Sequence, residues 1–168
     1  LKALEDLIPH GDCRGKALGV QMEDEVSGPL TLVFSLLEVT ETGLEGWFDS
    51  RCPICANEEN VLKPVKAAME EKGFQFLSDS MNPPHHVPGD SHFVQTLLKV
   101  YEAYTGRKGE CKSTGGGTYV HDLKNGVAFG ASMPETDNRM HGADEFAVID
   151  ELMISAKIFA QAIVELCR

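Results

Sequence analysis

The spacing of apolar residues in the first half of the chain predicts a small layer of helices and strands. Apolar side chains recur at helical intervals over residues 1–8, and Pro9 with the glycines after it ends this helix. Residues 30–37 alternate as a strand with one strongly apolar face does, and residues 44–51 return after a tight turn. We therefore expect a short helix followed by an antiparallel hairpin.

A second helix with apolar residues at helical spacing follows the hairpin and ends at Gly73. Asn57 or Asn60 is suited to its N-cap, and Asn60 fits better because Pro64 then falls in the first turn, where no backbone hydrogen bond is lost. Residues 74–77 read as a third short strand. The order of these elements predicts an α+β layer with antiparallel pairing.

The second half of the chain has a different character. A proline-rich crossing over residues 82–90 precedes an amphipathic helix over residues 93–104, and a final apolar helix runs from Asp150 to about Cys167. Because glycine-rich loops alternate with short segments between these helices, we place a boundary in the crossing. The expected domains are residues 1–85 and 86–168.

Composition and charge narrow the class of protein. A net charge of −11 over 168 residues argues against a nucleic-acid surface, which needs clustered lysine and arginine. The sequence contains no apolar run long enough to cross a bilayer and does not open with a signal peptide. Its five cysteines form no disulfide framework and fit a reducing compartment, so we expect a cytoplasmic protein without membrane contact.

Arg51 is the first candidate for chemistry. It ends the second strand of the expected hairpin, where Trp47 and Asp49 share its face and Phe48 points to the other. A guanidinium group at such a rigid edge can hold a carboxylate in bidentate fashion. The alternative for Arg51 is an ion pair with Asp49 or with a carboxylate of a helix.

Two later motifs also carry polar chemistry. Gly115–Gly116–Gly117 offers a run of backbone amides that can bind an anion, although glycine runs are often only turns. His141, followed by Glu145, offers an imidazole to a metal ion, or it is a structural histidine near a helix start. One histidine cannot hold a catalytic metal.

The remaining cysteine and histidine pairs are weaker signals. Cys52 and Cys55 form a C-x-x-C that lacks a second pair for a zinc knuckle and lacks the context of a redox motif. His85 and His86 lie among prolines on an extended segment and point in opposite directions, so one can reach a site while the other faces solvent.

In their order and spacing these motifs resemble a known family. Phe48–Pro53, His85–Val87, Gly115–Tyr119 and Met140–Phe146 resemble the dinuclear metal-dependent exopeptidases of the aminoacylase/glutamate carboxypeptidase type. Within that group the chain looks most like the Xaa-His dipeptidase branch, which is carnosinase-like and PepV-like. The resemblance implies the second half of a lid-type antiparallel sheet with helices on one face. The C-terminal α/β part of a zinc-exopeptidase catalytic domain would follow it.

The resemblance also implies roles for individual residues. His141 matches a histidine that ligates one of two divalent metal ions, zinc or manganese. Arg51 matches the lid arginine that grips the C-terminal carboxylate of a dipeptide or short peptide. Gly115, Gly116, Gly117 and Thr118 match a backbone segment that binds the same carboxylate. Residues 1–85 would be part of the lid.

The same resemblance implies that most of the active site is supplied from elsewhere. The family's other metal ligands and its general base, one glutamate of a pair, lie upstream, and Glu58–Glu59 is not that pair. Residues 1–8 also read as the end of a helix already begun. We therefore expect a missing N-terminal part of the catalytic domain, no metal bound by this chain alone, and no catalysis by it.

Two alternatives of another class stay open. The chain could be a small module in which Cys52, Cys55 and a histidine hold a structural zinc ion. It could also be an association module whose exposed sheet edge pairs with another copy to form a homo-oligomer.

Overall fold

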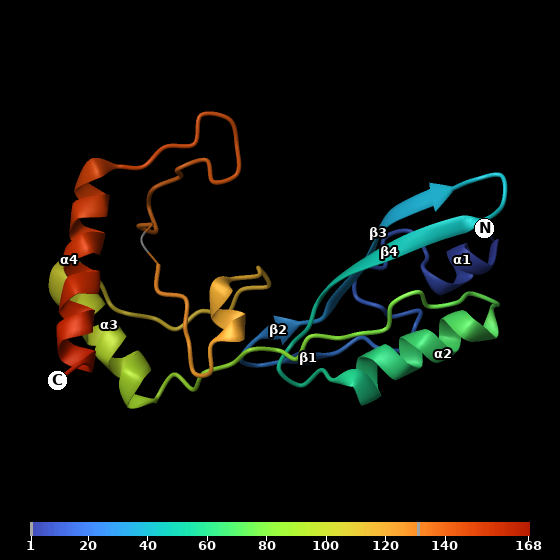
Figure 1. Cartoon of the computed structure of the whole chain (residues 1–168), viewed down its shortest axis with the longest axis horizontal. Helices are drawn as coiled ribbons and strands as arrows, with labels where there is room; N and C mark the ends of the chain where they lie inside the picture. The colour runs from blue at the N-terminus through green and yellow to red at the C-terminus, as the bar shows by residue number, and fades with distance from the viewer. Residues whose placement is uncertain (1, 131) are drawn as a thin grey trace. The chain divides into compact units, whose positions relative to one another are not determined.

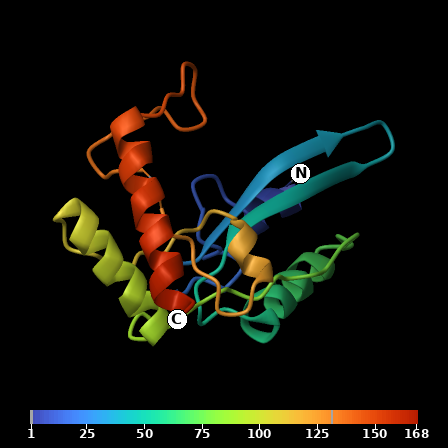
Figure 2. The ribbon, with the colours of Figure 1, turned by 60° about the vertical axis from the view of Figure 1, so that its left-hand side comes forward.

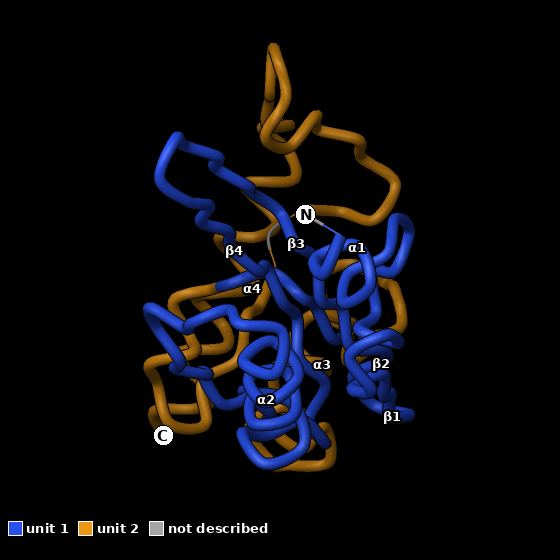
Figure 3. The backbone as a smooth tube through the Cα atoms, turned by 90° about the vertical axis from the view of Figure 1, so that its right-hand side faces the viewer, with its two compact units in different colours: residues 1–86, 113–117 blue, residues 87–112, 118–168 orange. Residues whose placement is uncertain are grey.

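The structure is a computed structural model that describes residues 2–130 and 132–168. It divides into two compact units, which Figure 3 shows in blue and orange. Unit 1 comprises residues 1–86 and 113–117, and unit 2 comprises residues 87–112 and 118–168. The predicted α+β class is confirmed, because the described residues form two small antiparallel sheets and four α-helices.

Unit 1 is built around the predicted hairpin, seen in Figure 1. Its regular elements are α1 (Lys2–Leu7), β1 (Glu23–Asp24), β2 (Gly28–Pro29), β3 (Thr31–Val39) and β4 (Leu44–Arg51). The expected opening helix is confirmed as α1, although Leu1 lies outside the described residues. In the hairpin, Phe34 pairs with Phe48 and Leu36 with Trp47, so a bulge lies between Phe34 and Leu36.

The helix after the hairpin begins earlier than we predicted. A π-helical turn, η1 (Glu58–Leu62), leads into α2 (Lys63–Glu71). Asn57 is the N-cap, and its side chain accepts hydrogen bonds from the backbone N–H groups of Glu59 and Asn60 at 2.9 and 3.1 Å. The expectation of Asn60 as the cap is wrong because its side chain instead accepts the Asn57 N–H and closes a capping box. Pro64 still falls near the start of an α-helix.

The predicted third strand at residues 74–77 is wrong. Among the described residues, that segment pairs with no strand. β3 pairs with β4, and Leu32 of β3 also forms an isolated bridge with Arg14. The Phe74 N–H donates instead to the Met69 carbonyl at the end of α2. Phe74 and Phe76 pack against the core, so their apolar character serves packing and not a sheet.

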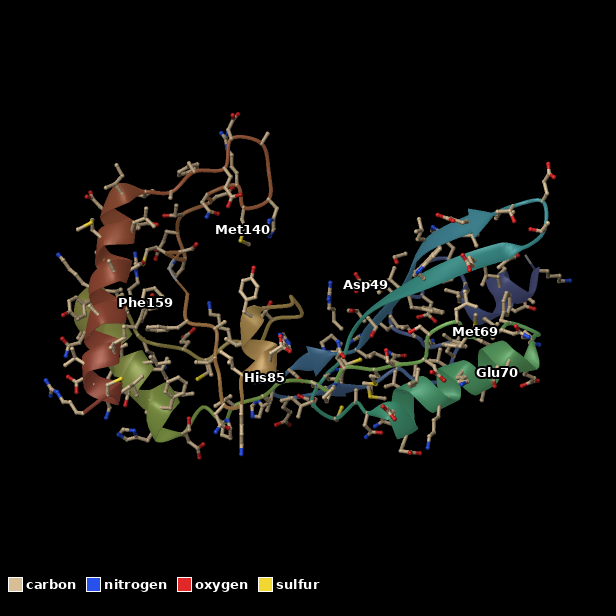
Figure 4. The ribbon with its side chains drawn as sticks, viewed as in Figure 1. Asp49, Met69, Glu70, His85, Met140 and Phe159 are labelled. Atoms are coloured by element: carbon tan, nitrogen blue, oxygen red, sulfur yellow. The ribbon has the colours of Figure 1, made fainter. Side chains whose placement is uncertain are left out.

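The core of unit 1 joins its helices to the hairpin. Leu30 and Val20 are fully buried at its centre. The other buried members are Leu4, Leu7, Leu18, Leu32, Ala56, Val61, Val65 and Met69. Met69 is buried while its neighbour Glu70 is exposed, as expected for an amphipathic helix (Figure 4). The hairpin adds Phe34 and Phe48, whose rings meet edge to face at 5.2 Å.

Unit 2 is a pair of helices with long loops. The pair consists of α3 (His92–Thr105) and α4 (Ile149–Leu166), and the 3-10 turn η2 (Tyr119–Asp122) lies between them in sequence. Ser91 caps α3 through its hydroxyl, and Gly106 ends it in the left-handed conformation. Helices α3 and α4 pack side by side (Figure 2). Among the described residues no helix is both long and apolar enough to span a membrane.

Candidate functional site

Arg51 is the last residue of β4 and pairs with Thr31 of β3. Its guanidinium Nη2 lies 3.4 Å from the carboxylate Oδ2 of Asp49, which is labelled in Figure 4. The side chains of Arg51 and Asp49 are 51% and 53% exposed. Trp47 is also exposed whereas Phe48 packs against the core, so Arg51, Asp49 and Trp47 share the open face of the hairpin as predicted.

The chain just beyond Arg51 is held firmly. Pro53 is fully buried. The Ile54 N–H donates to the Ser27 hydroxyl at 2.8 Å, and the Cys55 N–H donates to the Asp24 carboxylate at 3.3 Å. These bonds attach the segment after β4 to the turn between β1 and β2. The backbone of Arg51 is therefore fixed from both sides, while its side chain is open to solvent.

Asp24 is the centre of this attachment. The backbone N–H and the hydroxyl of Ser27, together with the N–H groups of Cys55 and Val26, lower the pKa of the Asp24 carboxyl well below its ordinary value. A carboxylate that accepts several hydrogen bonds is favoured in its charged form. At neutral pH Asp24 is therefore an anion that joins two loops of unit 1.

The glycine loop reaches Arg51 within unit 1. A Cβ atom placed on Gly115 would lie 3.1 Å from Cγ and 3.3 Å from Cβ of Arg51. Such a distance is shorter than ordinary contact, so the absence of a side chain at Gly115 permits the approach. The Gly116 N–H donates to the Thr114 hydroxyl at 3.2 Å, and Gly117 borders open space. Within the described residues no hydrogen bond involves the N–H of Gly115 or Gly117.

This arrangement has the chemical groups that bind a carboxylate. The guanidinium fork of Arg51 can donate two parallel hydrogen bonds, and glycine N–H groups can donate to an anion without steric hindrance. The contact between Arg51 and Gly115 joins parts of the chain that are far apart in sequence. The structure therefore brings together two of the residues to which the sequence resemblance gives one role.

Thr118 and His141 belong to unit 2. Thr118 is the N-cap of η2, and its N–H donates to Nδ1 of His121 at 3.2 Å. His141 follows Met140, labelled in Figure 4, in a loop that the Phe146 N–H closes by donating to the Asn138 carbonyl.

His141 has an unusual backbone conformation. Its φ of 63° lies in the left-handed region, which is strained for a residue with a side chain. Its N–H donates to the Glu145 carboxylate at 3.2 Å. Arg139 and Asp144 of the same loop also have positive φ and form an ion pair at 3.8 Å. In proteins, strained backbone conformations cluster at functional sites.

The residues present do not make up a site for two metal ions. Residues 2–130 and 132–168 contain no group of three histidine, cysteine or carboxylate side chains that could hold a metal. His141 offers one ligand, and a pair of catalytic ions needs several. No step of a reaction through metal can be derived from this chain's geometry.

The weaker candidates have these positions. Cys52 is half-buried, with its sulfur 3.4 Å from the Ser50 hydroxyl, and Cys55 is exposed; both are free thiols. His85, labelled in Figure 4, is half-buried while His86 is exposed, consistent with side chains that point in opposite directions.

Sequence reasoning missed the Asp24–Ser27 attachment. An aspartate three residues before a serine and four before a glycine is a local turn signal that could have indicated the Ser27 contacts. The bond from Asp24 to Cys55 spans 31 positions and has no local signal.

Comparison with known proteins identifies relatives that are dipeptidases by name. No protein-family model matches the chain. "Putative dipeptidase YtjP" of Bacillus subtilis is 41% identical over 159 residues, which is 94% of this chain and 34% of that protein. "Beta-Ala-Xaa dipeptidase" of Lactobacillus delbrueckii is 36% identical over 165 residues, which is 96% of this chain and 34% of that protein. The chain spans about a third of the length of these relatives. It is homologous to one segment of them, and the resemblance to dipeptidases predicted from its motifs is confirmed.

Proposed function

We propose that this chain is the substrate-carboxylate-binding part of a metal-dependent dipeptidase. Arg51 and the glycine loop Gly115–Thr118 hold the free C-terminal carboxylate of a dipeptide or short peptide. The observation that carries the proposal is the contact of Gly115 with the Arg51 side chain inside unit 1. Homology to dipeptidases over nearly the whole chain supports it.

The chemistry of Arg51 explains why the substrate must be short. A bidentate guanidinium fixes the position and the plane of a carboxylate. Because β4 and the Asp24–Ser27 attachment fix the backbone of Arg51, the carboxylate would be bound at a fixed place. A peptide bond a set distance from that carboxylate is then presented for cleavage, and a longer C-terminal extension would leave Arg51 without its partner.

Hydrolysis itself belongs to the whole dipeptidase in this proposal. His141 would be one ligand of two divalent ions, zinc or manganese, which supply a Lewis acid and an activated water when bound. The other ligands and the general base would come from the part of a dipeptidase that this chain does not match. The chain alone would bind and orient the carboxylate without cleaving the peptide.

Binding of a peptide with and without its carboxylate tests the proposal. Calorimetric titration of the 168-residue chain compares alanyl-alanine with alanyl-alanine amide. We expect the amide and the Arg51→Gln variant to bind about tenfold to a hundredfold more weakly, because hydrogen bonds to charged groups contribute about 1.5–3 kcal/mol. Arg14→Gln is the matched control, since Arg14 also lies in unit 1 and forms an ion pair with Glu23 at 3.1 Å. Equal binding of acid and amide would rule the proposal out.

A glycine pair tests the loop. Gly115→Ala places a methyl group 3.1 Å from Arg51 and should weaken binding of alanyl-alanine severalfold, whereas Gly43→Ala, in the hairpin turn of unit 1 and outside the proposed site, projects into open space and should not. Hydrolysis assays with added zinc or manganese should detect no cleavage by the chain alone. Cleavage would contradict its assignment as a binding part only.

A further inference from the structure

The carboxylate site already contains a carboxylate of the protein itself. In the hairpin register Thr31 pairs with Arg51 and Val33 pairs with Asp49. Because Arg51 and Asp49 are two residues apart on β4, their side chains lie on the same face of the hairpin. Asp49 Oδ2 lies 3.4 Å from Arg51 Nη2, and no other ion pair of Arg51 occurs among the described residues. The guanidinium that would receive a substrate is therefore partly engaged.

We propose that Asp49 is an internal competitor for the substrate carboxylate, which sets the affinity of Arg51 and disfavours peptides with an acidic C-terminal residue. This inference rests on the proposed function of Arg51. Before binding, Asp49 neutralises the guanidinium. On binding, the peptide carboxylate takes the guanidinium fork, and Asp49 remains beside it as an uncompensated negative charge.

The geometry of the pair suits an exchange of partners. Charge-assisted hydrogen bonds of arginine are normally about 2.7–2.9 Å long, and the Asp49 contact is longer and involves one nitrogen atom. Both side chains are about half exposed, so solvent screens their attraction. A peptide carboxylate that approaches the fork in its plane can make two shorter bonds and displace Asp49.

The position of Asp49 also explains why peptides with an acidic C-terminal residue would be disfavoured. Residues two apart on a strand are about 6.6–6.8 Å apart along the chain. Asp49 Oδ2 also lies only 3.4 Å from the guanidinium that the peptide carboxylate would contact, so the C-terminal residue of the peptide would lie within about one Debye length of Asp49, about 8 Å at physiological salt. A second negative charge there is repelled, while an uncharged side chain is not.

Asp49→Asn tests the inference while keeping the shape of the side chain. Calorimetric titration measures the dissociation constants of alanyl-alanine and alanyl-aspartate for the 168-residue chain. We expect Asp49→Asn to tighten alanyl-alanine binding about twofold to fivefold, the range that removal of an exposed ion pair allows. Alanyl-aspartate binding should tighten by a larger factor. Glu45→Gln removes the same charge from β4 about 20 Å from Arg51 and should change neither.

The outcomes separate this inference from the proposed function. If Arg51→Gln loses binding but Asp49→Asn leaves it unchanged or weakens it, the competitor is ruled out and the proposed function stands. If Arg51→Gln has no effect, the proposed function fails, and the inference fails with it. In the Arg51→Gln background Asp49→Asn should no longer tighten alanyl-alanine, because Asp49 acts through Arg51. Tightening there would indicate a general charge effect and overturn the inference.

Discussion

The two units of the chain use apolar side chains differently. In unit 1 the described residues bury ten apolar side chains in one cluster, drawn from α1, η1, α2, β3 and the loops between them. In the described part of unit 2 the cluster contains four, all from α3 and α4. Unit 1 has the organisation of a small domain with its own core, whereas unit 2 has one helix–helix seam.

Helix α4 makes the difference clear. One face packs against α3 through Ile158 and Ala162, and Ser155 is buried on the same side. A second side of the helix is also apolar, and its exposed large residues are Ile149, Leu152, Met153, Phe159, Ile163 and Val164. α4 therefore has apolar residues on two faces and a polar stripe that includes Asp150, Lys157 and Glu165, which is the sequence of an element packed on two faces. The proposed carboxylate site lies in the unit with the larger core, and an isolated chain should have a firm unit 1 and a weaker unit 2.

Core truncation should give the largest effect. Leu30→Ala, at a position with 0% exposure, should lower the free energy of unfolding of unit 1 by about 3 kcal/mol, because the core cannot fill the cavity. The single tryptophan, Trp47, lies on β4, so its fluorescence during urea unfolding reports on unit 1. Ile158→Ala, at 3% exposure in unit 2, should shift the helical circular dichroism and leave the Trp47 transition in place. If both variants shifted the Trp47 transition equally, the units would unfold together, and the proposed difference between their cores would be wrong.

Helix caps should give an intermediate effect in both units. Asn57→Ala removes the acceptor of two N–H groups at the start of η1, and Ser91→Ala removes the acceptor of the Val94 N–H. Each change should cost about 1 kcal/mol, with the larger cost at Asn57. Trp47 fluorescence measures the first, and hydrogen exchange of α3 amides measures the second. Asn57→Asp should restore most of the loss, since aspartate is an equally good N-cap.

Sequence patterns predicted the elements that depend on local chemistry. The hairpin, α3 and the final apolar helix follow from alternation and helical spacing. The failures involve competition between partners. Asn57 and Asn60 have the same side chain, and the contacts that each makes with the other decide which one caps. Residues 74–77 have strand composition, but packing on the core and the end of α2 determine their conformation.

The candidate site was predictable only in part. Arg51 at a strand end and a glycine run are visible in the sequence, and the family resemblance gave both the same role. The approach of Gly115 to Arg51 depends on a tertiary path that no local pattern encodes. The Asp24–Ser27 attachment likewise depends on loops that meet only in the folded chain. The roles of Arg51, the glycine loop and His141 stay predictions.

The smallest expected effect is the pH dependence that Asp24 gives to the stability of unit 1. Hydrogen bonds lower the pKa of Asp24 in the folded state below its ordinary value of 3.8, so folding favours the carboxylate. Its contribution is fully present above that ordinary value and is lost as pH falls below it. The wild-type chain should therefore be more stable than Asp24→Asn near neutral pH, and the difference should shrink below about pH 4. The effect is small because the Asp24 carboxylate is only half-buried, so water screens its charge.

Urea unfolding followed by Trp47 fluorescence at several pH values measures this difference. Taking the difference between the two chains cancels the other acidic groups, including Asp12, whose burial raises its pKa but whose bonds from backbone N–H groups lower it overall. Ser27→Ala keeps the carboxylate but removes one donor, so its pH dependence should lie between those of the wild type and Asp24→Asn. If the stability difference between the wild type and Asp24→Asn stayed constant with pH, the negative charge of Asp24 would not contribute, and Asp24 would stabilise the fold only as a hydrogen-bond acceptor. Charge would then contribute nothing to holding the segment behind Arg51, which would depend on hydrogen bonds to neutral acceptors at Asp24 and Ser27 and on the burial of Pro53.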